Sequence, residues 1–216
     1  MSVDFDPACQ RCDRLASFLK DVKNTYPDYF CQPVPAFGDA DPALLIVGLA
    51  PGMHGANATG RPFTGDAAGI LLYEMLHKHG FSNQPTSISA DDDLQLHQSR
   101  ITNAVKCLPP QNKPVGAEVN NCRDFLVEEI KAISKPLLLL ALGSIAHKSI
   151  IAALNLKQKD YVFAHAALHE LGEGLTLIDS YHCSRYNTQT GRLTPEMFDH
   201  VFAIARQWVD ERYPRV

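Results

Sequence analysis

Four short apolar runs divide the chain, and segments with helical spacing of apolar residues separate them. The runs cover residues 44–49, 101–105, 136–142 and 175–180. The runs over 44–49 and 136–142 are almost continuously apolar, which is typical of strands buried on both faces of a parallel sheet. Helical spacing covers residues 13–24, 67–79, 116–133, 145–154 and 195–213. This alternation predicts an α/β fold, a three-layer αβα sandwich around a central four-stranded parallel sheet.

The helical patterns also predict which side chains enter the core. The helix over 67–79 is expected to bury Ile70, Leu71, Met75 and Leu76. The helix over 195–213 carries a stripe interpreted as core, formed by Met197, Val201, Ile204, Ala205 and Trp208. Residues 26–41 are rich in proline and are expected to be irregular. Residues 80–96, with an acidic run at 91–93, are expected to be a solvated surface loop.

The connection between the first strand and its helix is unusually long. It runs from Gly48 to Asp66 with the sequence GLAPGMHGANATGRPFTGD, whereas loops of this kind usually have roughly 2–6 residues. Its glycines allow backbone N–H groups to approach a ligand closely, and it carries one large aromatic residue, Phe63. It lacks the Gly-Lys-Ser/Thr of a P-loop and the GxGxxG spacing. The loop therefore predicts a pocket for a flat, mostly neutral group, with an ordinary surface loop as the alternative.

Other unusual residues also follow strands, at the edge where open α/β sheets bind ligands. Asn103 stands within the second strand, where asparagine is unfavourable. Its side chain either forms hydrogen bonds to neighbouring loops or binds the edge of a ligand that has one donor and one acceptor, such as a pyrimidine base. Gly143 and Ser144 follow the third strand, and Ser144 is expected to cap the next helix or to open an anion site there. The segment 181–187 follows the fourth strand and contains His182.

Composition limits the possible classes of protein. A chain of 216 residues predicts one domain over 1–216. The formal net charge of −4 does not indicate a nucleic-acid binder, so such a protein would need a local basic face. No apolar run approaches the roughly 20 residues of a membrane span, and the N-terminus does not resemble a signal peptide. A cytoplasmic location and no membrane association are expected.

The six cysteines suggest a metal site instead of disulfides. Cys9 and Cys12 form a C-x2-C pair, and Cys107 and Cys122 form a looser second pair. Four thiolates from two separated segments fit a tetrahedral metal site or a [4Fe–4S] cluster, and spacing alone does not separate these. His165 and His169 have the i, i+4 spacing of a zinc pair, but without an HExxH motif a surface or packing role is expected.

Taken together, these segments resemble the iron–sulfur uracil-DNA glycosylases, most closely the fifth family of that group. The matching segments are the long glycine-rich loop, the C-x2-C pair, QPVPAFGD, TNAVKCLPPQNKP, NCRDFL, ALGSIAHKS and SYHCSRYNTQTGRLT. The resemblance implies a glycosylase that excises uracil from DNA in base-excision repair, with other deaminated bases such as hypoxanthine as further substrates. It also implies a [4Fe–4S] cluster held by Cys9, Cys12, Cys107 and Cys122.

The resemblance further implies roles for individual residues. Phe63 would stack on the everted base, Asn103 would contact its edge and His182 would stabilise its carbonyl oxygen. The loop around Gly48, Leu49, Ala50 and Gly52 would complete the base pocket. DNA contacts are expected from Gly143, Ser144, Ser184 and Arg185. Lys106, Lys113 and Arg192 are further expected phosphate contacts.

Two positions depart from related patterns. Leu49 stands where the fourth family carries a glutamate, so either another residue positions the water or the reaction relies on stabilisation of the leaving group by the backbone. The candidates are Asn57, His54 and Asp66, with Asn57 preferred. Cys183 replaces a proline next to His182, which is expected to loosen the histidine.

Two other functions remain open at this point. The main alternative is a DNA-binding or damage-sensing module that a metal site stabilises and that has no catalytic activity. A nucleotide hydrolase is disfavoured, because only Asp66 provides a carboxylate near the strand ends. The protein is expected to be a monomer that acts on DNA containing uracil.

Overall fold

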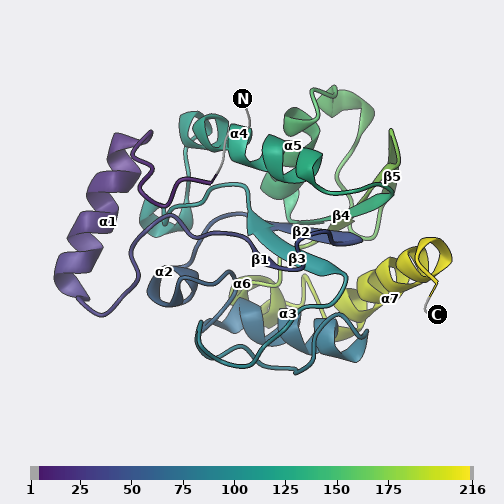
Figure 1. Cartoon of the computed structure of the whole chain (residues 1–216), viewed down its shortest axis with the longest axis horizontal. Coiled ribbons are helices and arrows are strands. Elements are labelled where there is room, and N and C mark those ends of the chain that lie inside the picture. Colours follow the sequence, from purple (N-terminus) through teal and green to yellow (C-terminus); the bar gives the residue numbers. More distant parts are fainter. Residues whose placement is uncertain (1–4, 215–216) are drawn as a thin grey trace.

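The computed structural model describes residues 5–214, which form an α/β fold around a mixed sheet (Figure 1). Its strand order is β1-β3-β2-β4-β6-β5. The four inner strands are β3 (Ser99–Asn103), β2 (Leu44–Gly48), β4 (Leu137–Leu142) and β6 (Leu175–Ser180), and they are mutually parallel. The predicted parallel core is therefore confirmed.

Two antiparallel edge strands extend this core and were not predicted. The strand β1 (Phe37–Gly38) pairs with β3 and lies within the segment expected to be irregular. The strand β5 (Leu168–Gly172) pairs with β6, and its register shifts between Glu170 and Gly172. The described sheet thus has six strands instead of four.

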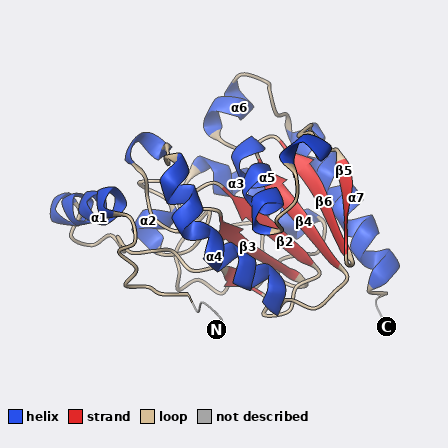
Figure 2. Ribbon diagram, turned by 90° about the horizontal axis from the view of Figure 1, so that it is seen from above, coloured by secondary structure: helices blue, strands red, loops and turns tan. Residues whose placement is uncertain are grey.

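Helices cover both faces of the sheet and produce the predicted three layers (Figures 1 and 2). One layer contains α3 (Ala67–Lys78) and α7 (Pro195–Arg212). The other contains α4 (Gly116–Ala132) and α5 (Ser144–Ala153). The helix α1 (Asp13–Thr25) stands at one end of the molecule, and the short helices α2 (Ala56–Thr59) and α6 (Arg185–Gln189) lie in loops. Single 3-10 turns cover Pro110–Asn112 and Gln158–Asp160.

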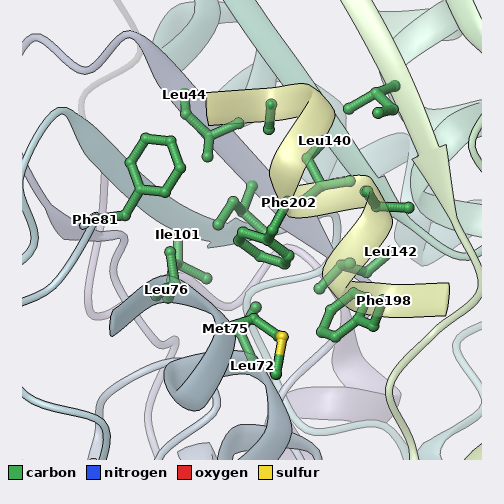
Figure 3. Close-up of a cluster of buried hydrophobic side chains, with 14 of the residues drawn as sticks. Leu44, Leu72, Met75, Leu76, Phe81, Ile101, Leu140, Leu142, Phe198 and Phe202 are labelled. Atoms are coloured by element: carbon green, nitrogen blue, oxygen red, sulfur yellow. The ribbon is translucent and has the colours of Figure 1, made fainter. Parts of the chain in front are cut away.

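The apolar strands serve both layers because successive side chains point to opposite faces. Leu44 and Ile46 pack with the α3/α7 layer, whereas Leu45 and Val47 pack with the α4/α5 layer. On the α3/α7 side the phenyl rings of Phe198 and Phe202, together with labelled aliphatic side chains from α3 and the strands, fill the space against the sheet (Figure 3). The stripe predicted along α7 contributes to the same core: Val201, Ala205 and Trp208 are buried, and Met197 and Ile204 pack against them.

Two predictions about exposure were wrong. Ile70 is 70% exposed, and α3 instead buries Leu72 and Tyr73 beside Met75 and Leu76. The segment 80–96 is partly core, because Phe81, Leu94 and Leu96 are buried. Apolar side chains at irregular intervals in this segment carry no periodic signal, so the pattern reads as a polar loop.

The four parallel strands end at the same edge of the sheet. Gly48, the last residue of β2, is paired with Asn103, the last residue of β3. On the other side, Leu142 at the end of β4 is paired with Ser180 at the end of β6. The loops that follow these residues therefore start side by side. No helix in the described part of the chain is long and apolar enough to cross a membrane.

Candidate functional site

A cavity of about 670 Å³ opens at this edge of the sheet. Its size lies within the roughly 300–1,000 Å³ of pockets for small ligands. The loops after all four parallel strands contribute to its walls. Most of the residues predicted for the site line it: Leu49, Ala50, Gly52, Phe63, Asp66, Asn103, Gly143, Ser144, His182, Ser184 and Arg185.

Gly48 lies beneath the cavity and makes room for two of these side chains. A Cβ at this position would lie 2.7 Å from Cζ of Phe63 and would also collide with Oδ1 of Asn103. Only glycine therefore allows the aromatic ring and the amide to meet at the strand ends.

Phe63 is held in an unfavourable backbone conformation. Its φ is 54°, in the left-handed region that non-glycine residues seldom adopt. The backbone of Phe63 packs directly against Gly69 in α3, where a Cβ would lie only 2.8 Å from the carbonyl carbon of Phe63. The hydroxyl of Tyr73 donates to the carbonyl of Pro62 at 2.8 Å and secures the preceding residue. Strain of this kind persists only where the surroundings enforce it, and it often marks functional sites.

Arg61 anchors the same loop from its other side. Its guanidinium is buried, bonds Asp92 at 2.7 Å and the carbonyl of Ser89, and lies 4.6 Å from the ring centre of Phe37. The acidic run expected to be solvated thus provides a buried ion pair. A phosphate contact from Arg61 is excluded by these partners.

Asn103 presents an unused acceptor. The side chain is only 3% exposed, and its Oδ1 atom has no hydrogen-bond partner in the described structure. Burying an amide oxygen without a partner costs about 1–3 kcal/mol. An unpaired oxygen in the wall of a cavity indicates a ligand that donates a hydrogen bond.

His182 faces Phe63 across the cavity. The two rings are stacked, with centroids 5.9 Å apart and an interplanar angle of 29°. Burial lowers the pKa of His182 to about 4, so the imidazole is neutral near pH 7. Its Nδ1 atom is buried and has no partner among residues 5–214. With Nδ1 shielded, Nε2 is the nitrogen that can serve a ligand.

The main chain around His182 is fixed despite the missing proline. The amide of Asn187, in α6, donates to the carbonyl of His182 at 2.8 Å. The side chain of Cys183 is fully buried and packs into the core, and burial strongly raises the pKa of its thiol. The expectation that Cys183 loosens His182 is therefore not supported by these contacts.

Asp66 is the carboxylate that lines the cavity. Its Oδ1 atom accepts from the amides of Ala68 and Gly69 at 3.0 Å each, so it caps α3. Burial raises its pKa, and these two bonds oppose the rise. A Cβ at Gly55 would lie 2.8 Å from Cβ of Asp66, so glycine at 55 keeps this position free.

The preferred water-positioning residue, Asn57, does not reach the cavity. It lies in α2, is fully buried and directs its amide to the sulfur of Cys31 at 3.5 Å. His54 bonds the hydroxyl of Tyr29 at 2.9 Å and also lies outside the lining. The fold of the long loop thus leaves Asp66 as the one of the three candidates within the site.

The rim carries several expected DNA contacts, with two corrections. Arg185, Arg192 and Lys113 are exposed. Lys106 is not available to phosphates, because it is buried and bonds Glu129 at 2.8 Å. Ser144 does not cap α5: it is the first helical residue, Gly143 occupies the capping position with φ 97°, and no side chain closes this end.

The four predicted metal-binding cysteines gather at one end of the molecule. Cys107 and Cys122 are buried in a cluster with α1, and Cys9 and Cys12 pack against it. Burial, and next the charges of the other three cysteines, raise the pKa of Cys107 to about 12. Bidentate bonds from Arg14 to Glu118, at 2.8 and 2.7 Å, join α1 to α4 around this group.

Some lining residues were given no role by the sequence reasoning, although Tyr181 and Asn187 lie in the segment 181–187 that it singled out. Phe163 and Tyr181 form part of the wall, and Asn112, Ile145 and Asn187 also line it. Tyr181 directly follows a strand, which is a usable signal. Phe163 lies in a loop 19 residues before His182, where no local pattern points to the site.

This fold and site define an α/β protein with a cavity of small-ligand size at the carboxyl edge of its parallel strands. The chain belongs to the Uracil DNA glycosylase superfamily, whose sequence model matches residues 35–206. It is 43% identical to the type-5 uracil-DNA glycosylase of Thermus thermophilus over 205 residues, which cover 93% of each chain. It is 41% identical to a type-5 enzyme of Pyrobaculum aerophilum, over 91% of this chain and 87% of the relative. A type-4 enzyme of Archaeoglobus fulgidus is 31% identical over 81% of this chain and 76% of its own.

Proposed function

We propose that this protein hydrolyses the N-glycosidic bond of uracil in DNA and leaves an abasic site, as a base-excision repair glycosylase. One observation carries the proposal: the ring of Phe63, the unpaired Oδ1 of Asn103 and the imidazole of His182 meet in one cavity. The family assignment supports the same reaction.

The polar groups of the cavity match the edge of uracil. The N3–H group of the base donates to Oδ1 of Asn103, and the amide nitrogen of the same side chain donates to the O4 oxygen. Phe63 stacks on the base, which enters after rotating out of the duplex. The buried asparagine oxygen then has the partner that it lacks without ligand.

His182 acts on the departing base. Its neutral imidazole donates from Nε2 to a carbonyl oxygen of uracil while negative charge collects there. Removing one donor of this type from a preorganised site usually costs about 2.7–4 kcal/mol of transition-state stabilisation. Because His182 is neutral near pH 7, it stabilises the uracil anion by donating a hydrogen bond and keeps its own proton.

Asp66 takes the place of Asn57 in the proposed mechanism. One carboxylate oxygen caps α3, which leaves Oδ2 to orient the attacking water. The bond from the anomeric carbon to the base nitrogen breaks with its electron pair moving to uracil, and the water adds at that carbon. The proton that the water loses passes to the carboxylate of Asp66 and from there to solvent or the departing uracil. Leu49 contributes only an apolar wall at its position.

The rim supplies the DNA contacts. Arg185 and Arg192 lie beside Ser184 and the uncapped end of α5 at Gly143 and Ser144. Free N–H groups at a helix N-terminus and guanidinium groups both bind phosphate. These contacts provide the local basic face that a chain of net charge −4 needs.

We also propose a [4Fe–4S] cluster on Cys9, Cys12, Cys107 and Cys122. Cys107 and Cys122 are buried in one cluster and Cys9 and Cys12 pack against it, so four thiols from two separated segments gather there. Four cysteine thiolates are the ligand set of such clusters. A bound cluster would brace the loop around Cys107. Iron and sulfide analysis with an anaerobic absorption spectrum tests this. About four equivalents each of iron and sulfide per chain, and no zinc at the cysteines, are expected.

Release of uracil from a labelled oligonucleotide tests the activity. The wild type is expected to release uracil and His182→Ala to lose roughly 100- to 1,000-fold in rate. A noncatalytic damage sensor, the alternative, would bind the same oligonucleotide and release no base. A hypoxanthine oligonucleotide extends the test to a wider substrate range, and light scattering tests the proposed monomer.

A further inference from the structure

Three metal-ligating side chains meet next to Phe163, a residue of the cavity wall. They are His147 of α5, His169 of β5 and Asp179 of β6. One ligand atom from each lies within 4.8 Å of the other two. His147 and Asp179 are buried, and the side chain of His169 is 13% exposed. Histidine and carboxylate ligands in a nearly water-free setting are typical of a transition-metal site.

The hydrogen bonds of His147 do not balance for a neutral imidazole. Its Nδ1 atom lies 2.8 Å from Oδ1 of Asp179, and its Nε2 atom lies 3.0 Å from the carbonyl oxygen of Tyr161. Both neighbours are acceptors when the carboxylate is ionised, but neutral histidine carries a single N–H. One more cation is needed between His147 and Asp179, and it is either a proton or a metal ion.

His169 favours the metal ion. Its Nε2 atom lies 3.1 Å from the second oxygen of Asp179, so the carboxylate has one imidazole nitrogen at each oxygen. A divalent cation placed among these atoms would satisfy both nitrogens and the carboxylate at once. The bond from His147 to Tyr161 has the arrangement of an outer-shell contact, in which a ligating histidine donates its other N–H to a carbonyl.

We propose that His147, His169 and Asp179 form a zinc site that is separate from the cysteine cluster. Two imidazoles and one carboxylate are a known zinc ligand set, and zinc binds such nitrogen-rich sites more tightly than manganese or iron(II). The rings of Phe163 and Tyr161 stand edge-on to the histidines at 5.7 and 6.0 Å and restrict water.

The position of this site gives the metal a structural role. It joins the helix α5 to the two strands at one edge of the sheet. Asp179 lies two residues before Tyr181 in sequence, and the rings of Phe163 and Tyr181, both in the cavity wall, are 6.1 Å apart. Zinc would thus fix the segment that carries Phe163 against β6, independently of the reaction in the cavity.

Metal titration of the intact protein, with its cysteine cluster in place, tests the proposal. Zinc or cobalt(II) is added after removal of loosely bound metal, and content and thermal unfolding are measured. One equivalent of zinc is expected to bind and to raise the unfolding temperature. Cobalt in this site is expected to lack the sulfur-to-metal charge-transfer bands that cysteine ligands would produce, which distinguishes it from metal at the cysteines.

Ligand variants decide the assignment. His169→Asn and His147→Gln are each expected to weaken zinc binding by roughly 100-fold or more, whereas His97→Asn, at an exposed histidine, leaves it unchanged. His169 lies in an edge strand, so its variant remains useful if a change at buried His147 prevents folding. Equal zinc binding by wild type and His169→Asn, or no binding by the wild type, would overturn the proposal and leave a protonated histidine–aspartate pair.

Discussion

Replacing Gly48 with alanine tests the geometry of the base pocket without removing any functional group. The new methyl group would lie 2.7 Å from Cζ of Phe63, against about 3.5 Å for an ordinary contact between carbon atoms. The ring must therefore retreat by about 0.8 Å, and the amide of Asn103, which meets the same methyl group, must also move.

These shifts have different consequences for stability and for catalysis. Overpacking costs about 1–3 kcal/mol, and the smaller conformational freedom of unfolded alanine offsets about 0.4–1 kcal/mol of it. The free energy of unfolding is thus expected to fall by about 1–2 kcal/mol. A misplacement near 1 Å reduces rates by about 100-fold, which corresponds to about 2.7 kcal/mol at the transition state.

The assay compares uracil release and urea unfolding for Gly48→Ala and for Gly116→Ala. Gly116 begins α4, and a Cβ there would meet nothing within 4 Å. This control is expected to keep full activity and at least wild-type stability. If Gly48→Ala releases uracil at the wild-type rate while remaining folded, the close meeting of Phe63 and Asn103 is not required and the proposed pocket is wrong.

Three further changes probe single contacts. Between pH 7 and pH 5 the unfolded state binds a proton at His182, whereas the native state does not, because its pKa there is about 4. The free energy of unfolding of the wild type, measured in urea, should therefore drop by about 1–2 kcal/mol more than that of His182→Ala over this range. The same drop in both proteins would contradict this. Asp66→Asn keeps an oxygen to cap α3, so unfolding free energy should change by less than about 1 kcal/mol. Its single-turnover uracil release should nevertheless fall at least about 10-fold, and an unchanged rate would remove Asp66 from the mechanism. Arg61→Met leaves Asp92 without its buried partner and should cost about 3 kcal/mol in thermal unfolding, against less than about 1 kcal/mol for exposed Lys78→Met. Equal losses of stability in the two variants would show that the buried ion pair of Arg61 stabilises the fold no more than the exposed one of Lys78.

The sequence predicted the parallel core well because the central strands β2 and β4 are apolar on both faces. The edge strands escaped notice for physical reasons. The strand β1 has two residues, and Leu168 to Gly172 alternate poorly and are mostly exposed. Such short or half-exposed strands form because a neighbour offers unpaired backbone groups, and that neighbour is not visible in local sequence.

The site was predictable where residues directly follow strands and less so inside the long loop. Asn103 and His182 reach the cavity because parallel strand ends align. Asn57 does not, because the loop forms the helix α2 and turns that side chain inward. The group formed by His147, His169 and Asp179 joins residues 32 and 10 positions apart, so it appears only after the chain folds.

The edges of the sheet have a consequence for how this protein behaves at high concentration. An open edge presents unpaired backbone groups to other chains and invites aggregation. Here one edge is only two residues long, and the other is interrupted by the irregularity between Glu170 and Gly172. Neither offers a long, flat template, so a second molecule cannot readily add its own strand, and the enzyme is protected from edge-to-edge polymerisation while it remains folded.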